Sequence, residues 1–281
     1  MGTRAIERQA LAAACAVAAD QGVLCGEAEV VHSGSNVLVR LRPSPVVARV
    51  MTGTVALHDD PESWLKREVS VLSFLAPTGL AVAPSALIAP GPYESGGLWM
   101  TFWESVEHRR SADLCDGAER LGRALRDLHD ALSGFLGELG GFVDLQHDIE
   151  RLRRQLRPTA TLSAREIDSL GERLIALGET VFGTSLPAQA LHGDASLSNL
   201  LCTSEELLWN DFEDAFRGPV HWDLAGYVMS LEYRGADSAF VQRALDAYGG
   251  VGRRELASFT EAHELYDEIW RRYDAQRRSA G

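Results

Sequence analysis

The sequence has few basic residues and no long apolar run. Of its 281 residues, 27 are Lys or Arg and 40 are Asp or Glu, and Lys66 is the only lysine. The formal charge of −13 and the pI near 5.1 argue against a protein that neutralises phosphates in bulk, so we expect no nucleic-acid partner. No run of 18 apolar residues occurs, so we expect no membrane span and no membrane partner.

The sequence also lacks cysteine pairs and Cys/His clusters at the spacing of a zinc site. We therefore expect its cysteines to be buried free thiols in a reducing compartment. They are Cys15, Cys25, Cys115 and Cys202. The alanine-rich run at residues 10–19 predicts a surface helix rather than a secretion signal, because alanine is the strongest helix former. The protein is thus predicted to be cytoplasmic.

Short β-branched segments separated by turn residues occupy the first hundred residues. Five strands are expected, at residues 27–31, 37–41, 46–50, 85–89 and 98–103. Between the third and fourth strands, Asp60, Pro61 and Glu62 form a strong helix start, with a capping carboxylate before a proline at the first helical position. We therefore predict a five-stranded antiparallel sheet with one inserted helix.

Beyond the fifth strand, apolar residues recur at helical spacing. Leu121, Leu125 and Leu128, for example, share one face of a predicted helix. The predicted fold class is therefore α+β, with a first domain at residues 1–104 and a mainly helical second domain at residues 105–281. Of the formal charge of −13, −10 lies in the second domain.

One stretch of the second domain has the residue types that phosphoryl transfer requires. An apolar segment ends at His-Gly-Asp (residues 192–194), four residues precede Asn199, and a hairpin then leads to Asp211. Phosphoryl transfer needs a carboxylate that accepts the proton of the attacking hydroxyl and oxygen ligands for Mg²⁺. Asp194, Asn199 and Asp211 are the candidates for these roles.

These residues, in this order, resemble the aminoglycoside phosphotransferase family, relatives of the protein kinases. His-Gly-Asp-x4-Asn and the Asp-Phe-Glu at residues 211–213 are similar to its catalytic and metal-binding loops. Residues 217–225 and 121–129 resemble two further segments of that family. The resemblance extends over residues 27–273 and implies a protein-kinase-like bilobal fold.

The resemblance implies a role for each motif residue. Asp194 would be the catalytic base, and Asn199 and Asp211 would be the Mg²⁺ ligands. The alternative for Asp194 is a turn aspartate that caps its own loop. Glu213 replaces the glycine of the protein-kinase triplet and would face the metal or the substrate. Asp223 would cap the following helix and support the catalytic loop.

The expected nucleotide site departs from the family at one position. Arg49 stands on the third strand where the family has a lysine, and Glu68 on the inserted helix is placed to pair with it. Arginine can hold a phosphate with two nitrogens, but its longer, planar side chain is not equivalent to lysine. The alternative for Arg49 is an ordinary surface arginine.

A turn and a strand are expected to supply the other nucleotide contacts. The turn residues Gly34, Ser35 and Asn36 would place N–H groups and a hydroxyl over phosphates, although most such turns are plain hairpins. Backbone groups of Thr101 and Trp103 would bind the base. The implied cofactors are ATP or GTP and Mg²⁺, and the sequence does not distinguish the two nucleotides.

The acidity of the second domain favours a cationic acceptor, since carboxylates pair with ammonium groups and attract cations. The candidate acceptor contacts are Asp194, Glu213, Glu232, Glu261, Glu264, Asp267 and Glu268. For each of the helical carboxylates, a solvated helix face that pairs with nearby arginines is the alternative.

Together these inferences predict an O-phosphotransferase that uses a nucleoside triphosphate to inactivate a cationic antibiotic. The acceptor would be an aminoglycoside or a basic cyclic peptide of the capreomycin or viomycin type, bound to a monomer or homodimer. A metabolic kinase for an amino alcohol, amino acid or sugar is the second hypothesis. A nucleotide-binding pseudoenzyme is the third, and the complete set of Asp194, Asn199 and Asp211 argues against it.

Overall fold

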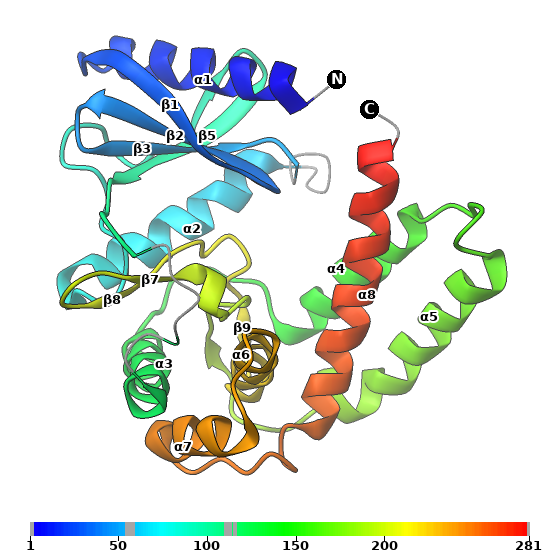
Figure 1. The fold of residues 1–281 in the computed structure, drawn as a ribbon. Coiled ribbons are helices and arrows are strands. Elements are labelled where there is room, and N and C mark those ends of the chain that lie inside the picture. Colours follow the sequence, from blue (N-terminus) through cyan, green and yellow to red (C-terminus); the bar gives the residue numbers. More distant parts are fainter. Residues whose placement is uncertain (1–2, 54–59, 110–113, 115–116, 280–281) are drawn as a thin grey trace. The chain divides into compact units, whose positions relative to one another are not determined.

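The chain forms two compact units, which are described separately. The computed structural model describes residues 3–53, 60–109, 114 and 117–279. Unit 1 comprises residues 1–109 and 200–213, and unit 2 comprises residues 110–199 and 214–281. Figure 1 labels their α-helices and several of their strands.

Unit 1 is built on the predicted five-stranded antiparallel sheet, with the strand order β1-β2-β3-β5-β4. The strands are β1 (Cys25–Ser33), β2 (Asn36–Pro43), β3 (Val46–Met51), β4 (Tyr93–Ser95) and β5 (Leu98–Glu104). Helix α2 (Pro61–Leu75) is inserted between β3 and β4, and its cap is the predicted one, because the Asp60 carboxylate accepts the N–H of Ser63 at 3.1 Å.

The two faces of the sheet meet different helices (Figure 1). Because strand residues alternate between faces, Ala48 and Val50 of β3 lie on one face, in an apolar core shared with the alanine-rich helix α1 (Thr3–Asp20). Arg49, between them, lies on the opposite face and contacts Glu68 of α2. Alternation on one strand therefore separates the core from the charged residues.

The fourth strand is not where the sequence predicts it. Residues 85–89 form no strand, and β4 occupies the edge of the sheet instead. The hydroxyl of Ser85 accepts the backbone N–H groups of Leu87 and Ile88, at 3.1 and 3.3 Å. Local bonds of this kind compete with strand pairing, so the predicted strand is wrong.

The prediction that the cysteines are free thiols is also wrong. Cys15 of α1 and Cys25 of β1 form a disulfide, with their Cα atoms 5.8 Å apart, which is within the usual range for such bonds. None of the described cysteines is a free thiol, and Cys115 lies outside the described residues. Packing of α1 against β1 brings this pair together, and the spacing along the chain did not indicate it.

A later hairpin also belongs to unit 1. Its strands are β7 (Leu200–Cys202) and β8 (Leu207–Trp209). The backbone of Trp209 accepts the N–H of Val82 and donates to the carbonyl of Leu80, both at 2.9 Å. These bonds attach the segment that carries Asp211 to the first hundred residues.

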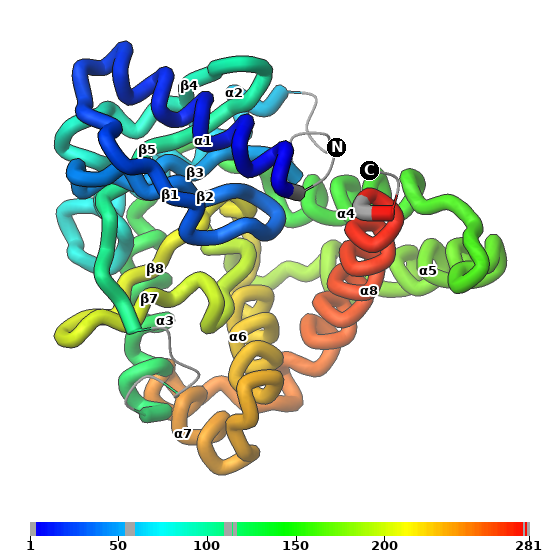
Figure 2. The backbone as a smooth tube through the Cα atoms, turned by 45° about the horizontal axis from the view of Figure 1, so that its top comes forward, coloured from blue at the N-terminus to red at the C-terminus, as the bar shows by residue number. Residues whose placement is uncertain are grey.

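Unit 2 is mainly helical, which confirms the α+β class. Its helices are α3 (Ala118–Leu132), α4 (Phe142–Gln155), α5 (Ala164–Leu177), α6 (His221–Tyr233), α7 (Ser238–Tyr248) and α8 (Ala257–Ser279). Helix α8 runs beside α4 and α5 (Figure 2). Trp222 of α6 is fully buried, and its ring lies 5.6 Å from that of Phe142 and 3.8 Å from that of His263. Within the described part of the chain, no helix is both long and apolar enough to span a membrane.

Candidate active site

Arg49 is the charged centre of unit 1. It pairs with Leu38 of β2 and Thr101 of β5 within the sheet, and only 5% of it is exposed. It is therefore not the surface arginine of the alternative interpretation. A cation buried this far requires partners for its charge.

Three carboxylates provide these partners. Nη1 of Arg49 donates to Glu68 at 3.3 Å, and Nη2 lies 2.7 Å from Asp211 and 2.7 Å from Glu213. Burial alone would lower the pKa of Arg49, but the three negative charges outweigh it and raise that pKa well above its usual value. The sequence predicts the contact with Glu68 but not the other two.

With all four groups ionised, the cluster has three negative charges and one positive charge. Burial raises the pKa of Glu68 to about 7, against the effect of Arg49 and with the help of Asp211 and Glu213. Burial likewise raises the pKa of Glu213. Among the described residues, Oε1 of Glu68 has no hydrogen-bond partner. Three carboxylates around one guanidinium suit the addition of a further cation.

Asn36 connects this cluster to the turn between β1 and β2. Its Nδ2 donates to Oε1 of Glu213 at 3.2 Å, and its Oδ1 accepts the N–H of Thr52 at 3.2 Å. The turn itself is closed by the N–H of Gly34, which donates to the carbonyl of Asn36 at 3.0 Å. Ser35 accepts the N–H of Gly53 through its carbonyl. That this turn binds phosphate stays a prediction.

Thr101 and Trp103 extend the same network along β5. The hydroxyl of Thr101 donates to Oε2 of Glu68 at 3.3 Å and accepts Nε1–H of Trp103 at 2.9 Å. The backbone N–H groups of Phe102 and Glu104 bond to residues 90 and 83. The expected contacts of the Thr101 and Trp103 backbone with the nucleotide base stay predictions. The side chains of both residues connect β5 to Glu68.

Asp211 has an unusual backbone conformation. Among the described residues it is the one non-glycine residue with a positive φ, at 63°. Asp and Asn adopt this left-handed region more readily than other side chains, and such residues often mark functional sites. The backbone turn aims the carboxylate at Arg49.

In unit 2, Asp194 and Asn199 lie together. Asn199, at the end of the short helix η4 (Leu197–Asn199), donates through Nδ2 to Oδ2 of Asp194 at 2.8 Å and to its carbonyl at 2.9 Å. Asn199 is buried, whereas Asp194 is exposed. The pair is a solvent-facing carboxylate in a fixed orientation, which suits a general base.

Asp223 holds the loop that precedes Asp194. Its fully buried carboxylate accepts the backbone N–H groups of His192 at 2.8 Å and Gly193 at 3.0 Å. Burial acts to raise the pKa of Asp223, but its hydrogen bonds, led by that of His129, lower it overall. Asp223 does not cap α6, which begins without a side-chain cap. The capping part of the prediction is therefore wrong, and the loop support is observed.

Gly193 is required by this arrangement. It has φ +89°, and a Cβ at this position would lie 2.0 Å from the carbonyl oxygen of Asp214. Its own carbonyl accepts Nε1–H of Trp222 at 3.0 Å. Only glycine can adopt this conformation at such close approach without displacing the backbone.

Asp223 has a further side-chain partner that the sequence did not indicate, His129. Nε2 of His129 contacts Asp223 at 3.0 Å, and it carries the hydrogen because a carboxylate only accepts. Nδ1 of His129 contacts the hydroxyl of Tyr248 at 2.8 Å. His129 lies in a segment that resembles the family, but nothing in the sequence indicated that Tyr248 lies beside it.

A comparison with models of protein families identifies the family of this chain. Residues 31–259 match the model of the phosphotransferase enzyme family. The chain belongs to this family.

A curated relative of this chain is an uncharacterized protein of Deinococcus radiodurans. The two are 29% identical over 208 residues, which is 69% of this chain and 59% of the relative. The chain thus matches less than two thirds of the length of that relative.

Solved structures of several kinases and phosphotransferases share the fold of this chain. Amicoumacin kinase hAmiN in complex with AMP-PNP, Ca²⁺ and Ami has a TM-score of 0.68 at 11% identity, covering 87% of this chain and 80% of the kinase. Choline kinase LicA from Streptococcus pneumoniae has a TM-score of 0.67 at 15% identity, covering 94% and 90%. Aminoglycoside-3'-phosphotransferase of type VIII has a TM-score of 0.63 at 19% identity, and the match covers 92% of this chain and 98% of that enzyme. Identities this low show the fold alone.

Among the predicted acceptor contacts on the helices of unit 2, Glu232 and Glu268 already pair with arginines. Glu232 forms an ion pair with Arg253. Glu268 lies 2.7 Å from Arg173 and 2.8 Å from Arg272. The other predicted acceptor contacts on α8 are exposed; they are Glu261, Glu264 and Asp267.

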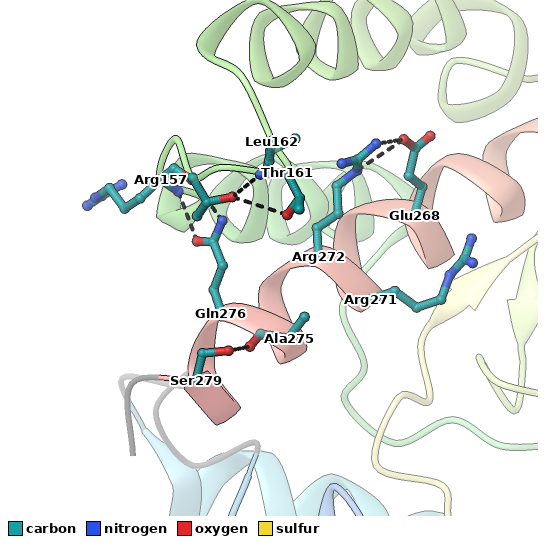
Figure 3. Close-up of a pocket in the computed structure, with 10 residues that line it drawn as sticks. Arg157, Thr161, Leu162, Glu268, Arg271, Arg272, Ala275, Gln276 and Ser279 are labelled. Atoms are coloured by element: carbon teal, nitrogen blue, oxygen red, sulfur yellow. Dashed lines mark hydrogen bonds and ion pairs between the residues drawn. The ribbon is translucent and has the colours of Figure 1, made fainter.

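Unit 2 also has a hollow of about 890 Å³ between α8 and residues 157–162 (Figure 3). Three arginines are among its lining residues: Arg157, Arg271 and Arg272. Glu268 is the carboxylate among the residues that line it, and Figure 3 shows it bonded to Arg272. The charge of this hollow favours an anion over a cation, so it does not support a cationic acceptor at Glu268.

The described residues contain no group of three or more His, Cys, Asp or Glu side chains arranged as a metal site. The donor types nonetheless fit Mg²⁺, which takes oxygen ligands and needs only one or two carboxylates besides water and phosphate oxygens. Asp211 and Glu213 offer such oxygens in unit 1, in a cluster that already has surplus negative charge.

Proposed function

We propose that this phosphotransferase transfers the γ-phosphoryl group of ATP or GTP to a hydroxyl of a cationic antibiotic, an aminoglycoside or a basic cyclic peptide. The observation that supports phosphoryl transfer most is Asp194, an exposed carboxylate oriented by Asn199 on a loop that Asp223 holds through two backbone N–H groups. The charge of −10 on residues 105–281 supports a cationic acceptor.

In this mechanism Asp194 accepts the proton of the acceptor hydroxyl while the hydroxyl oxygen bonds to the γ-phosphorus. The bond to the β–γ bridging oxygen breaks, and the nucleoside diphosphate leaves. Asn199 keeps the carboxylate in place and, with Asp211, would hold Mg²⁺. The metal would supply neutralisation of the phosphate charge.

The exposed carboxylates of α8 are the proposed contacts for the ammonium groups of the acceptor. Glu261 and Glu264 are three residues apart on the helix, and neither forms an ion pair with another described residue that the acceptor would have to displace. Glu268 would first have to release Arg173 and Arg272. We therefore assign the larger part of acceptor binding to Glu261, Glu264 and Asp267.

A metabolic kinase for an amino alcohol is the second candidate. The structural likeness to a choline kinase favours it, and such an acceptor is also cationic. Both candidates use the same groups for the chemistry. They differ in the size of the acceptor that unit 2 must accommodate.

An acceptor panel tests the proposal. We expect Mg²⁺-dependent release of nucleoside diphosphate with at least one aminoglycoside or basic cyclic peptide, and mass spectrometry should locate the phosphate on a hydroxyl. Choline, ethanolamine, neutral sugars and amino acids complete the panel. Turnover of these small acceptors without turnover of any antibiotic would contradict the antibiotic proposal and support the metabolic kinase.

A further inference from the structure

One nitrogen of Arg49 bridges two carboxylates that are suited to a metal ion. Its Nη2 lies 2.7 Å from Oδ1 of Asp211 and 2.7 Å from Oε2 of Glu213. Glu213 is held from another side by Nδ2 of Asn36, at 3.2 Å from Oε1. The guanidinium therefore supplies the positive charge between these two oxygens that a divalent cation would otherwise supply.

The shape of arginine makes this bridge possible. The planar guanidinium has two terminal nitrogens. Nη1 donates to Glu68, and Nη2 contacts Asp211 and Glu213. A lysine has a single terminal nitrogen, so it cannot contact Glu68 with one nitrogen and Asp211 and Glu213 with another. The departure from the family lysine thus creates a contact that a lysine at this position would leave incomplete.

We infer that Arg49 is a built-in competitor of the divalent cation, and that its release from Asp211 and Glu213 sets the metal affinity of the site. This inference rests on the proposed role of Asp211 as a metal ligand. Once released, the guanidinium can bind phosphate oxygens of the nucleotide instead. Metal and nucleotide then favour each other's binding.

Two variants separate specific bridging from a general charge effect. Arg49→Met removes the charge and the bridge, whereas Arg49→Lys keeps the charge and removes the fork. A positive charge near the site weakens metal binding in both the wild type and Arg49→Lys. Only loss of the bridge distinguishes these two proteins.

Direct metal binding tests the inference without any turnover. Mn²⁺ alone is titrated into the nucleotide-free full chain and followed by electron paramagnetic resonance. We expect Arg49→Lys to bind Mn²⁺ about fivefold or more tightly than the wild type, and Arg49→Met more tightly still. Arg42→Lys is the matched control, because Arg42 forms an exposed ion pair with Glu29 in the same sheet and its change should leave the affinity unaltered.

Each outcome has a defined consequence. If Arg49→Lys binds Mn²⁺ with wild-type affinity or more weakly, the competitor inference is overturned while the metal site stands. If no variant and no wild-type protein binds Mn²⁺, both the inference and the proposed metal role of Asp211 fail. Should Arg49→Met not fold, ¹⁵N resonances of the Arg49 guanidinium in the wild type, assigned with Arg49→Lys, must shift when Mg²⁺ is added; unchanged resonances would overturn the inference.

Discussion

The two units hold their buried carboxylates by different means. In unit 1 a single guanidinium holds three carboxylates, and all of these groups are side chains. In unit 2 Asp223 is held by two backbone N–H groups and by His129. Side chains can exchange partners by rotating, whereas backbone donors move only if the loop moves. Unit 1 is therefore suited to rearrange when a ligand binds, and unit 2 to keep Asp194 in place.

The largest effect is expected from Asp194→Asn. Loss of the proton acceptor should lower kcat about a thousandfold, since a positioned general base contributes roughly 10²–10⁴-fold. We assign nucleotide binding to unit 1, so the Kd for the nucleotide should stay within about twofold of the wild-type value. A tenfold change in Kd would correspond to about 1.4 kcal/mol. Steady-state rates and calorimetric nucleotide titration measure both. A variant that keeps more than about a tenth of the wild-type kcat would have lost less than a general base contributes. Asp194 would then not be the base.

Asp223→Asn should have the next largest effect, on stability. The amide side chain can accept only one of the two backbone N–H groups well and turns its own NH₂ toward the other. We expect the free energy of unfolding to fall by about 3 kcal/mol, because hydrogen bonds to a buried charge are lost and a donor is left unsatisfied. Denaturant unfolding measures the change.

Asp237→Asn is the control for this substitution. Asp237 caps α7 through the N–H of Phe240, and asparagine caps helices equally well. This variant should stay within about 0.5 kcal/mol of the wild type. Equal losses in the two variants would contradict the special role assigned to Asp223.

Acid should weaken unit 2 through His263. Burial lowers the pKa of His263 from 6.5 to about 4, so the unfolded chain takes up the proton first as the pH falls. The resulting loss of stability develops between pH 6.5 and about 4, and it amounts to at most about 3 kcal/mol. His263→Gln should flatten the dependence of unfolding free energy on pH in this window. The exposed His147 is the control, and an equal flattening by His147→Gln would contradict the assignment.

The smallest effect is expected from Thr101→Val in unit 1. Valine preserves the branched shape but removes the hydroxyl that bonds to Glu68 and Trp103. The free energy of unfolding should fall by about 1 to 2 kcal/mol. Because Glu68 then has one partner fewer, Mn²⁺ affinity should change less than in Arg49→Lys. A larger change in metal affinity than in Arg49→Lys would show that the charge cluster is not centred on Arg49.

Local signals predicted most of the elements. The Asp60 and Pro61 signal marks the start of α2, and alternation along residues 46–50 predicts a strand with Arg49 on the face opposite Ala48. The strand predicted at residues 85–89 does not form, because the Ser85 hydroxyl accepts backbone N–H groups of the same segment. The disulfide of Cys15 and Cys25 depends on how α1 packs against β1, which spacing does not encode.

The sequence by itself determined which candidate residues the protein offers: the order of Asp194, Asn199 and Asp211 is a property of the chain, and so is the arginine at position 49. The tertiary structure decided which of these charges meet. Arg49 reaches Glu213 across 164 positions of sequence, and Tyr248 reaches His129 across 119. Contacts over such distances depend on packing of whole elements, because no local rule of propensity or spacing relates the two partners.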